Sequence, residues 1–438
     1  MSEPSPEPVD VSQLAQQHPG EIAERVSRMD DEQAIELLGQ IEETEKVAEA
    51  LGAMDPEDGA RLFVELGREK QTDILAEMAP DDAVDLLEEL PDEMVRAVLS
   101  DLNREDSAEL TALMAYPPDT AGGMMSPDVV AVPADLTVQQ TIELLRRQAE
   151  EAETVYYAYV VDRQRRLQGV LALRDLVLAN PGTPIREVTR RDVAALPAEM
   201  DSEEVARTFD KLNYLALPVV DGENRLLGIV TVDDVIDRMR EQGTEDVLRL
   251  SGIPSGEEHP LEAPPTSIRK RLPWMMANIL FNLVAVIGVA VFEESIATIA
   301  FLAVLMPIIS DMGGNVATQA MAVAIRGMAT GQVVWKQLPL VLRKELLVGI
   351  GIGAVLGLEL SLITYLWRGN IYLGLIAMAS LWLNTIIAAI VGSFFPFLMK
   401  RLGFDPAMMS GSIVTTITDL TGFFLFLGMA TLYLHQLT

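Results

Sequence analysis

The apolar stretch 410–434, SGSIVTTITDLTGFFLFLGMATLYL, constrains the fold more than any other part of this chain. It is long enough to cross a lipid bilayer as a helix, which takes roughly 20 apolar residues. Its single formal charge is Asp419. At about 1.5 Å per residue, this carboxylate lies about 14 Å along the helix, near the middle of the hydrocarbon layer. A charge at that depth costs about 3 kcal/mol and therefore needs an explanation.

Asp419 shares one face of this helix with Ser412, Thr415 and Thr416, because the four residues follow the spacing i, i+3, i+4, i+7. Two interpretations stay open for the carboxyl group. It either bonds to a neighbouring helix and serves packing, or it lines a path for ions. The second is the usual role of an acid inside a membrane.

The net charge of −32 falls on one part of the chain. Residues 272–438 hold 7 basic and 7 acidic side chains, whereas residues 1–271 hold 26 basic and 58 acidic ones. So acidic a body argues against nucleic acid as a partner and attracts cations. The chain has no cysteine, which excludes disulfides and thiolate metal sites. Its first residues are acidic and Pro-rich, unlike a signal peptide.

Residues 20–123 predict an acidic helical domain, preceded by a disordered tail at 1–19. Segments that open with a helix-start signal and continue with apolar residues at helical spacing recur about every 25 residues. These segments are MDDEQAIELLGQI from Met29, MDPEDGARLFVEL from Met54 and MAPDDAVDLLEEL from Met78. The pattern predicts stacked short helices. Most of the carboxylates form a solvated face, but Asp81, Asp82 and Asp85 are candidates to share a hard cation.

From residue 124 the pattern changes to mixed strand and helix, and it is duplicated. Gly169 and Gly228 are 59 residues apart, and so are Asp175 and Asp234. Each copy has two predicted strands followed by a helix. The strands are YYAYVVD (156–162), LQGVLAL (167–173), LALPVVD (215–221) and LLGIVTV (226–232). The motifs GVLALRD and GIVTVDD resemble those of CBS domains, which gives a tandem pair at 124–184 and 185–246.

The CBS resemblance implies a nucleotide site. In that family the terminal Asp, which follows a Ser or Thr by three residues, contacts the ribose of an adenine nucleotide. Thr231 and Asp234 match this pattern, whereas the first copy has Ala172 ahead of Asp175. The alternative is a pair of domains that only dimerises and transmits a signal.

The segment 247–271 is predicted to be a connecting (plug) helix or linker, and its prolines prevent one continuous helix. Residues 272–438 predict a transmembrane domain of five spans, of which the second holds Pro307 and DMGGN (311–315) and is expected to be kinked or broken. Basic loop residues place the acidic domains in the cytoplasm and the C-terminus outside the plasma (inner) membrane. The spans are expected at about 272–292, 296–325, 340–366, 371–399 and 410–434.

This order resembles the MgtE family of magnesium channels over nearly the whole chain: an all-α acidic helical-repeat domain, an α/β tandem CBS pair and a five-helix transmembrane domain. The motifs that carry the resemblance are AETVYYAYVVD (152–162), GGNVATQ (313–319), VAIRGMATG (323–331) and LGFDPAMMSGSIVTTITDLTG (402–422). It implies Mg²⁺ influx down the electrochemical gradient, gated by cytosolic Mg²⁺, with adenine nucleotide as a further candidate ligand.

The resemblance also implies roles for single residues. Asp419 matches the selectivity carboxylate of the pore. The matching positions of the Mg²⁺ sensor are Asp201, Glu203, Asp234, Glu245, Asp246 and Asp405, whereas Asn213 and Gln242 stand where acids are expected. The nucleotide contacts match Tyr157, Arg174 and Asp175, with Thr231 and Asp234 in the second copy.

The residue chemistry of the spans is consistent with a hard cation. The candidate pore ligands are all oxygen: Asp419, Asn315, Asp311, the hydroxyls of Thr415 and Thr416, and backbone carbonyls at Gly313 and Gly314. Oxygen ligands suit Mg²⁺, Ca²⁺ or Mn²⁺, and few ligands with much bound water suit Mg²⁺ best. A two-fold homodimer brings two copies of Asp419 to a shared axis.

Two other function classes are weighed. A secondary carrier for another divalent cation, such as Co²⁺, Mn²⁺ or Ca²⁺, stays open. A CBS-regulated intramembrane metalloenzyme needs a His-rich motif, but His18, His259 and His435 all lie outside the predicted spans. The sequence therefore favours a transport protein over an enzyme.

Overall fold

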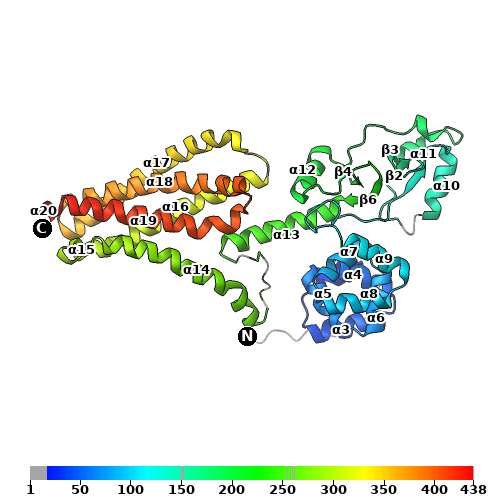
Figure 1. Cartoon of the computed structure of the whole chain (residues 1–438), viewed down its shortest axis with the longest axis horizontal. Helices are drawn as coiled ribbons and strands as arrows, with labels where there is room; N and C mark the ends of the chain where they lie inside the picture. Colours follow the sequence, from blue (N-terminus) through cyan, green and yellow to red (C-terminus); the bar gives the residue numbers. More distant parts are fainter. Residues whose placement is uncertain are drawn as a thin grey trace. The chain divides into compact units, whose positions relative to one another are not determined.

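The computed structural model describes residues 17–148, 152–253, 255–256, 258, 260 and 262–437. The chain divides into two compact units, Met1–Met239 and Arg240–Thr438 (Figure 1). Most of the disordered tail predicted at 1–19 lies outside the described residues, and so do several positions of the predicted linker.

The described part of the helical domain holds eight short helices that pack in two rows. Alternate helices are neighbours, α2 with α4, α4 with α6 and α6 with α8 in one row, and α3 with α5, α5 with α7 and α7 with α9 in the other. Each sequence repeat thus supplies one helix to each row, which confirms the predicted stack of short helices. The helices are α2 (Pro19–Val26), α3 (Asp31–Gln40), α4 (Thr44–Gly52), α5 (Pro56–Glu65), α6 (Arg68–Glu77), α7 (Pro80–Glu88), α8 (Asp92–Asp101) and α9 (Arg104–Leu113).

The start signals of the repeats act as expected. Asp30 accepts a hydrogen bond from the backbone N–H of Gln33 at 2.9 Å, and Asp55 accepts one from Glu57 at 3.2 Å. These side chains satisfy amide groups that have no partner within the helix. The apolar positions of the repeats, among them Phe63 and Leu87, are buried in the core.

The CBS pair contains two sheets of three strands with the same topology, in the orders β1-β2-β3 and β4-β5-β6. In each sheet the first two strands are parallel and the last two antiparallel. Both antiparallel pairs have an irregularity at the equivalent place, between Val160 and Val161 and between Val219 and Val220. The duplication predicted from sequence is therefore confirmed at the level of strand register.

The elements of the pair follow one another as the duplication predicts. They are β1 (Ala131–Pro133), α10 (Val138–Gln148), β2 (Tyr157–Val161), β3 (Leu167–Ala172), α11 (Leu173–Leu178), the 3-10 turn η1 (Ile185–Glu187), β4 (Leu196–Pro197), α12 (Ser202–Leu212), β5 (Ala216–Val220), β6 (Leu226–Thr231) and α13 (Val232–Leu250). Asn213, which stands where the family pattern has an acid, ends α12 with a left-handed φ of 54°. Asn adopts this conformation more readily than most residues.

Five described helices are long and apolar enough to cross a membrane. The second unit comprises α14 (Pro264–Ala290), α15 (Glu293–Thr298), α16 (Phe301–Ala329), the 3-10 turn η2 (Trp335–Gln337), α17 (Leu338–Arg368), α18 (Ile371–Leu402), α19 (Pro406–Leu432) and α20 (Leu434–Leu437). Helix α14 starts at Pro264, so the basic residues 269–271 lie inside a helix and not in a linker before it. Helix α13 ends at Leu250, so 247–271 is not one connecting helix.

The second span was expected to be kinked or broken, and it is not broken. Helix α16 continues from Phe301 through Pro307 and the pair Gly313-Gly314 to Ala329. Gly313 serves close packing instead, because a Cβ there would lie 2.2 Å from the side-chain nitrogen of Asn384 on α18. The one amide that the helix lacks is that of Pro307, which has no N–H to donate to the carbonyl of Ala303.

Candidate functional site

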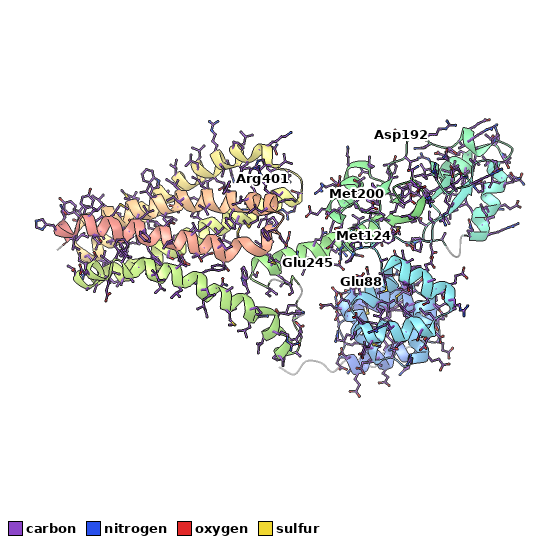
Figure 2. All side chains as sticks on the ribbon, viewed as in Figure 1. Glu88, Met124, Asp192, Met200, Glu245 and Arg401 are labelled. Atoms are coloured by element: carbon purple, nitrogen blue, oxygen red, sulfur yellow. The ribbon has the colours of Figure 1, made fainter. Side chains whose placement is uncertain are left out.

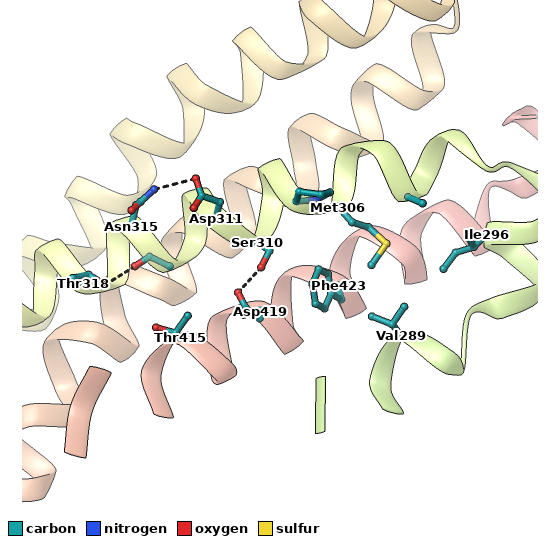
Figure 3. A pocket seen from close by; sticks show the side chains of 13 residues that line it. Val289, Ile296, Met306, Ser310, Asp311, Asn315, Thr318, Thr415, Asp419 and Phe423 are labelled. Carbon is teal, nitrogen blue, oxygen red and sulfur yellow. Dashed lines mark hydrogen bonds between the residues drawn. The ribbon is translucent and has the colours of Figure 1, made fainter. Parts of the chain in front are cut away.

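A cavity of about 660 Å³ opens in the second unit between α14, α15, α16 and α19 (Figure 3). Helix α16 contributes most of its wall, and α19 contributes three side chains one turn apart. Apolar side chains gather at one end and polar ones at the other. The lining residues are Val289, Ile296, Ala303, Met306, Pro307, Ser310, Asp311, Gly314, Asn315, Thr318, Thr415, Asp419 and Phe423.

Asp419 is held in this cavity by Ser310, whose hydroxyl donates a hydrogen bond to one carboxylate oxygen. On the same helix as Ser310, the amide of Asn315 donates to Asp311 at 3.2 Å (Figure 3). The hydroxyl of Thr415 donates to a carbonyl of its own helix at 2.9 Å. Its oxygen lone pairs therefore remain available to accept bonds from the cavity side.

Five of the seven predicted pore residues line the cavity: Asp311, Gly314, Asn315, Thr415 and Asp419. The other two do not. Gly313 faces Asn384, and the hydroxyl of Thr416 donates to the carbonyl of Ser412 at 2.8 Å.

Sequence reasoning missed Ser310 and Thr318, which also line the cavity. Their signal was present, because residues 310, 314 and 318 follow each other at the i+4 spacing of one helix face. The break expected at Gly313-Gly314 hid this periodicity, since a broken helix would not keep one face over three turns.

The first unit holds a second group of acids where α7 meets the second CBS domain. This interdomain acidic cluster consists of Asp81, Asp82, Glu153 and Asp234. Burial, followed by the nearby carboxylate of Asp234, raises the pKa of Asp82 to about 6 and the pKa of Glu153 to about 7. The same two causes raise the pKa of Asp81 well above its ordinary value. Proton or cation binding therefore relieves repulsion at this place.

The contacts of the interdomain acidic cluster show how tightly it is enclosed. One oxygen of Asp81 is buried and has no hydrogen-bond partner within the described residues. The carboxylate of Asp82 lies against Gly52, where a Cβ would come within 2.3 Å of its oxygen. Asp234 accepts a bond from the backbone N–H of Thr231 at 3.0 Å. Even so, no three His, Asp or Glu side chains in the described ranges are arranged as a preformed metal centre.

The remaining predicted sensor residues have protein partners. Asp201 caps α12 and accepts a bond from the N–H of Glu203 at 3.0 Å. Glu203 in turn pairs with Arg207 at 3.3 Å. Both residues belong to the first unit.

In the second unit, Arg249 joins two predicted metal ligands. Its guanidinium lies 2.9 Å from Glu245 on α13 and 3.0 Å from Asp405, which caps the N-terminus of α19 (Figure 2 labels Glu245). Asp246 is the next residue on α13. Glu245 and Asp405 thus share one arginine, and their predicted role as metal ligands stays a prediction. Arg249 carried no signal in the sequence that set it apart from other basic residues.

The predicted nucleotide residues of the first copy lie at the start of β2 and of α11, and those of the second copy lie at the end of β6 and in the first turn of α13. Asp175 accepts bonds from Arg190 at 2.8 and 3.1 Å, and Arg174 lies 3.6 Å from the same carboxylate. Tyr157 packs edge-on against Tyr214 of the second copy, with ring centres 6.3 Å apart. Arg190 and Tyr214 were not predicted, because both are distant in sequence from the motif that they join.

Comparison with known proteins identifies the parts of the chain. Residues 17–119 match the model of the MgtE intracellular N domain, residues 121–182 and 185–241 match the CBS domain, and residues 306–429 match the MgtE model described as a divalent cation transporter. A magnesium transporter MgtE of Thermus thermophilus is 39% identical over 75% of this chain and 73% of its own length. One from Bacillus subtilis is 35% identical over 74% and 72%, respectively.

Solved structures agree with this assignment. The cytosolic domain of the Mg²⁺ channel MgtE in complex with ATP is 38% identical, covers 52% of this chain and 93% of its own, and superimposes with a TM-score of 0.50. The CBS segment alone also resembles an inosine-5'-monophosphate dehydrogenase of Methanocaldococcus jannaschii, which is 30% identical over 114 residues. That similarity covers 26% of the chain and concerns the CBS pair only.

Proposed function

Because this chain belongs to the MgtE family of divalent cation transporters, we propose that it carries Mg²⁺ into the cell down its electrochemical gradient and acts as a channel, not as an enzyme. The observation that carries the proposal is the cavity in which Asp419, Asp311 and Asn315 offer side-chain oxygen atoms as metal ligands. Oxygen ligands suit hard divalent cations. A roomy cavity with few ligands suits Mg²⁺ in particular, which gives up its bound water reluctantly.

Cation flux into proteoliposomes tests this function, with Mg²⁺, Ca²⁺, Mn²⁺ and Co²⁺ offered one at a time. Uptake of Mg²⁺ ahead of the other ions supports the proposal. Preference for another divalent cation, together with the absence of unitary currents, would instead support a secondary carrier.

We further propose a homodimer whose soluble domains are cytoplasmic. The basic residues Arg326, Lys344 and Arg401 lie at the ends of α16 and α18 and the start of α17, which meet at one end of the antiparallel helices. Because Lys and Arg are enriched on the cytoplasmic side of membrane proteins, this end of the helices is expected to face the cytoplasm. Within this protomer α14 packs mainly against α19, and side chains such as Ile279 (69% exposed) turn outward. A second copy and lipid are the partners that would cover them.

The interdomain acidic cluster is our proposed cation sensor in the first unit. Asp81, Asp82 and Asp234 are enclosed together, and their raised pKa values mean that each ionised carboxylate disfavours the next. A divalent cation bound here offsets that repulsion as the pH rises and the carboxyl groups lose their protons. Such a cation therefore stabilises the packing of the helical domain on the second CBS domain.

This proposal predicts a dependence of stability on pH. Asp82 titrates at about 6 and Glu153 at about 7 when folded, but at about 4 when unfolded. The folded chain thus binds more protons between these values, so its stabilisation is complete below about pH 4 and is lost as pH rises through about 7. Without Mg²⁺, we expect the first thermal transition to fall by about 5 °C between about pH 5 and about pH 8.

The test variant is Asp82→Asn. Its matched control is Asp92→Asn, which changes an exposed acid at the start of α8. Asp82→Asn should flatten the pH dependence, and millimolar Mg²⁺ should restore the transition of the unmodified chain at the higher pH. An unchanged pH profile in Asp82→Asn, or no response to Mg²⁺, argues that the acids titrate without affecting domain packing.

We also propose that the CBS pair binds an adenine nucleotide such as ATP, with Asp175 and Asp234 as candidate ribose contacts. Tyr157 of the first copy and Tyr214 of the second form an aromatic pair, and the similar cytosolic domain was solved in complex with ATP. Calorimetry on the purified chain should show heat with ATP. Tyr157→Ala should weaken binding by about tenfold, since stacking on one base is worth about 1–3 kcal/mol.

The neighbouring Tyr156, which is 60% exposed, supplies the control Tyr156→Ala. Equal binding by the two variants removes Tyr157 from the site. No heat with ATP, ADP or AMP, with or without Mg²⁺, would mean that the pair only transmits a mechanical signal.

A further inference from the structure

The side chain of Asn384 is fully buried in the middle of α18, the 32-residue fourth span. An amide moved from water into an apolar interior costs about 2–7 kcal/mol if it finds no hydrogen bond. The amide of Asn384 therefore needs hydrogen-bond partners, and it has one on each of two other helices.

The nitrogen of Asn384 donates a hydrogen bond to the carbonyl of Ile309 on α16 at 3.1 Å. Its oxygen lies 3.1 Å from the hydroxyl of Thr421 on α19 and can accept a hydrogen bond from it. The same hydroxyl also lies 2.9 and 3.0 Å from the carbonyls of Ile417 and Thr418 in its own helix, so its one hydrogen is shared among these acceptors. A helical carbonyl has two lone pairs, so Ile309 can accept this bond in addition to its bond within the helix. One amide thus connects three spans through both of its polar atoms.

Two glycines make room for this amide. A Cβ on Gly313 of α16 would lie 2.2 Å from the nitrogen of Asn384, and a Cβ on Gly422 of α19 would lie 2.8 Å from it. Real side chains do not approach so closely. The two helices that bind the amide are therefore also the two that lack a side chain where the amide sits, so its position between them is closely defined.

The bonded residues are next to the cavity. Ile309 directly precedes Ser310, and Thr421 follows Asp419 by two residues. Ser310 and Asp419 are the pair whose hydrogen bond crosses from α16 to α19 inside the cavity. Asn384 lines no part of that cavity, so it reaches the carboxylate only through the backbones of the two helices.

We propose that Asn384 is a positioning residue for ion selection, which fixes the spacing and register of α16 and α19 and thereby holds Asp419 against Ser310. The inference rests on the proposed role of the cavity as the ion path. Its consequence is that a side chain without contact to the ion sets the preference for Mg²⁺. Without the amide, the two helices shift and the carboxylate no longer faces the cavity in one fixed arrangement.

The test compares the Mg²⁺-to-Ca²⁺ uptake ratio of purified variants in proteoliposomes, because this ratio does not depend on how much protein folds. We expect Asn384→Ala to lower the ratio by about fivefold, as the loss of hydrogen bonds near a charged group would. The control is Ser380→Ala, one turn earlier on α18. Ser380 is equally buried, but its hydroxyl bonds only to the carbonyl of Ile376 in its own helix at 2.7 Å, so the ratio should not change.

Thr421→Val is the milder second variant, because it keeps the shape and removes the donor to Asn384, while the other bonds that it loses lie within α19 itself. Thr421→Val should lower the ratio as Asn384→Ala does. Thr421→Ser keeps the hydroxyl and should therefore keep the ratio of the unmodified chain. If Asn384→Ala does not fold, this pair decides the question.

Asp419→Asn separates the two levels of the argument. If it shifts the ratio while Asn384→Ala and Thr421→Val keep the original one, the positioning role is wrong and the proposed function stands. If Asp419→Asn leaves both the ratio and the total Mg²⁺ uptake unchanged, the proposed ion path itself is wrong.

Discussion

Asp419→Asn should leave the transmembrane unit folded and lower Mg²⁺ uptake by about tenfold or more. At an effective dielectric constant near 20, two unit charges about 4 Å apart interact by about 4 kcal/mol. A hydrated ion stays farther from the carboxylate, so its attraction to Asp419 is smaller than this but still favourable. The Asn side chain preserves size and can still accept the bond from Ser310. What it loses is the charge that favours a divalent over a monovalent cation. Uptake into proteoliposomes and current under K⁺ alone measure both effects.

Two variants show whether position or charge is responsible. Glu359→Gln removes another acid within the spans, on α17, that is not part of the cavity wall; it should leave uptake unchanged. Asp419→Glu keeps the charge and should retain more uptake than Asp419→Asn. Normal Mg²⁺ uptake in Asp419→Asn would show that the carboxyl group serves packing, which is the interpretation that the sequence left open.

Much of the fold follows from patterns within short segments. The repeats beginning at Met29, Met54 and Met78 contain both the apolar periodicity and the capping residues of their helices, so local sequence defines the helical domain. The CBS strands are likewise short apolar runs whose order is repeated. In both cases the neighbours that stabilise an element lie within one repeat or in the next, where periodicity can be recognised.

The cavity was predictable in part. Asp419 stands out because a charge inside an apolar span is costly, and Asp311 and Asn315 stand out beside it. Asn384 does not, since an amide in a long apolar helix has many possible partners. Its bonds to Ile309 and Thr421 span 75 and 37 residues. Proline and paired glycines also suggested a break in α16, whereas packing against α18 keeps the helix continuous.

The interdomain acidic cluster was predictable only in part: Asp81 and Asp82 were candidates to share a cation and Asp234 matched the sensor, but the sequence did not join them to one another or to Glu153. Asp82 belongs to the helical domain, Glu153 to the first CBS copy and Asp234 to the second. Their pKa values depend on burial and mutual repulsion, which exist only after folding. The motif placed Asp234 at a nucleotide, and the fold adds a second group of neighbours to the same carboxylate.

Helix α13 carries one residue of each of two contacts that we propose to act in gating. Asp234, in its first turn, belongs to the interdomain acidic cluster, and Arg249, in its last turn, binds Asp405 at the start of α19. A cation that fixes the first turn thus acts on the helix whose other end is tied to α19. For this to close the pore, the closed state must bind the cation more tightly than the open state.

Millimolar Mg²⁺ on the cytoplasmic face should therefore lower the open probability by about tenfold, a shift of about 1.4 kcal/mol. In Arg249→Gln the ion pairs to Glu245 and Asp405 are lost, so current should persist in Mg²⁺ while the soluble half still becomes resistant to protease. Arg269→Gln, an exposed basic residue on α14, should behave like the unmodified chain in patch recordings. Persistent inhibition in Arg249→Gln would mean that the signal reaches the pore by another contact. Persistent inhibition after neutralising Glu245 and Asp246 would place the sensor in the helical domain, where Asp81 and Asp82 are the acids to replace next.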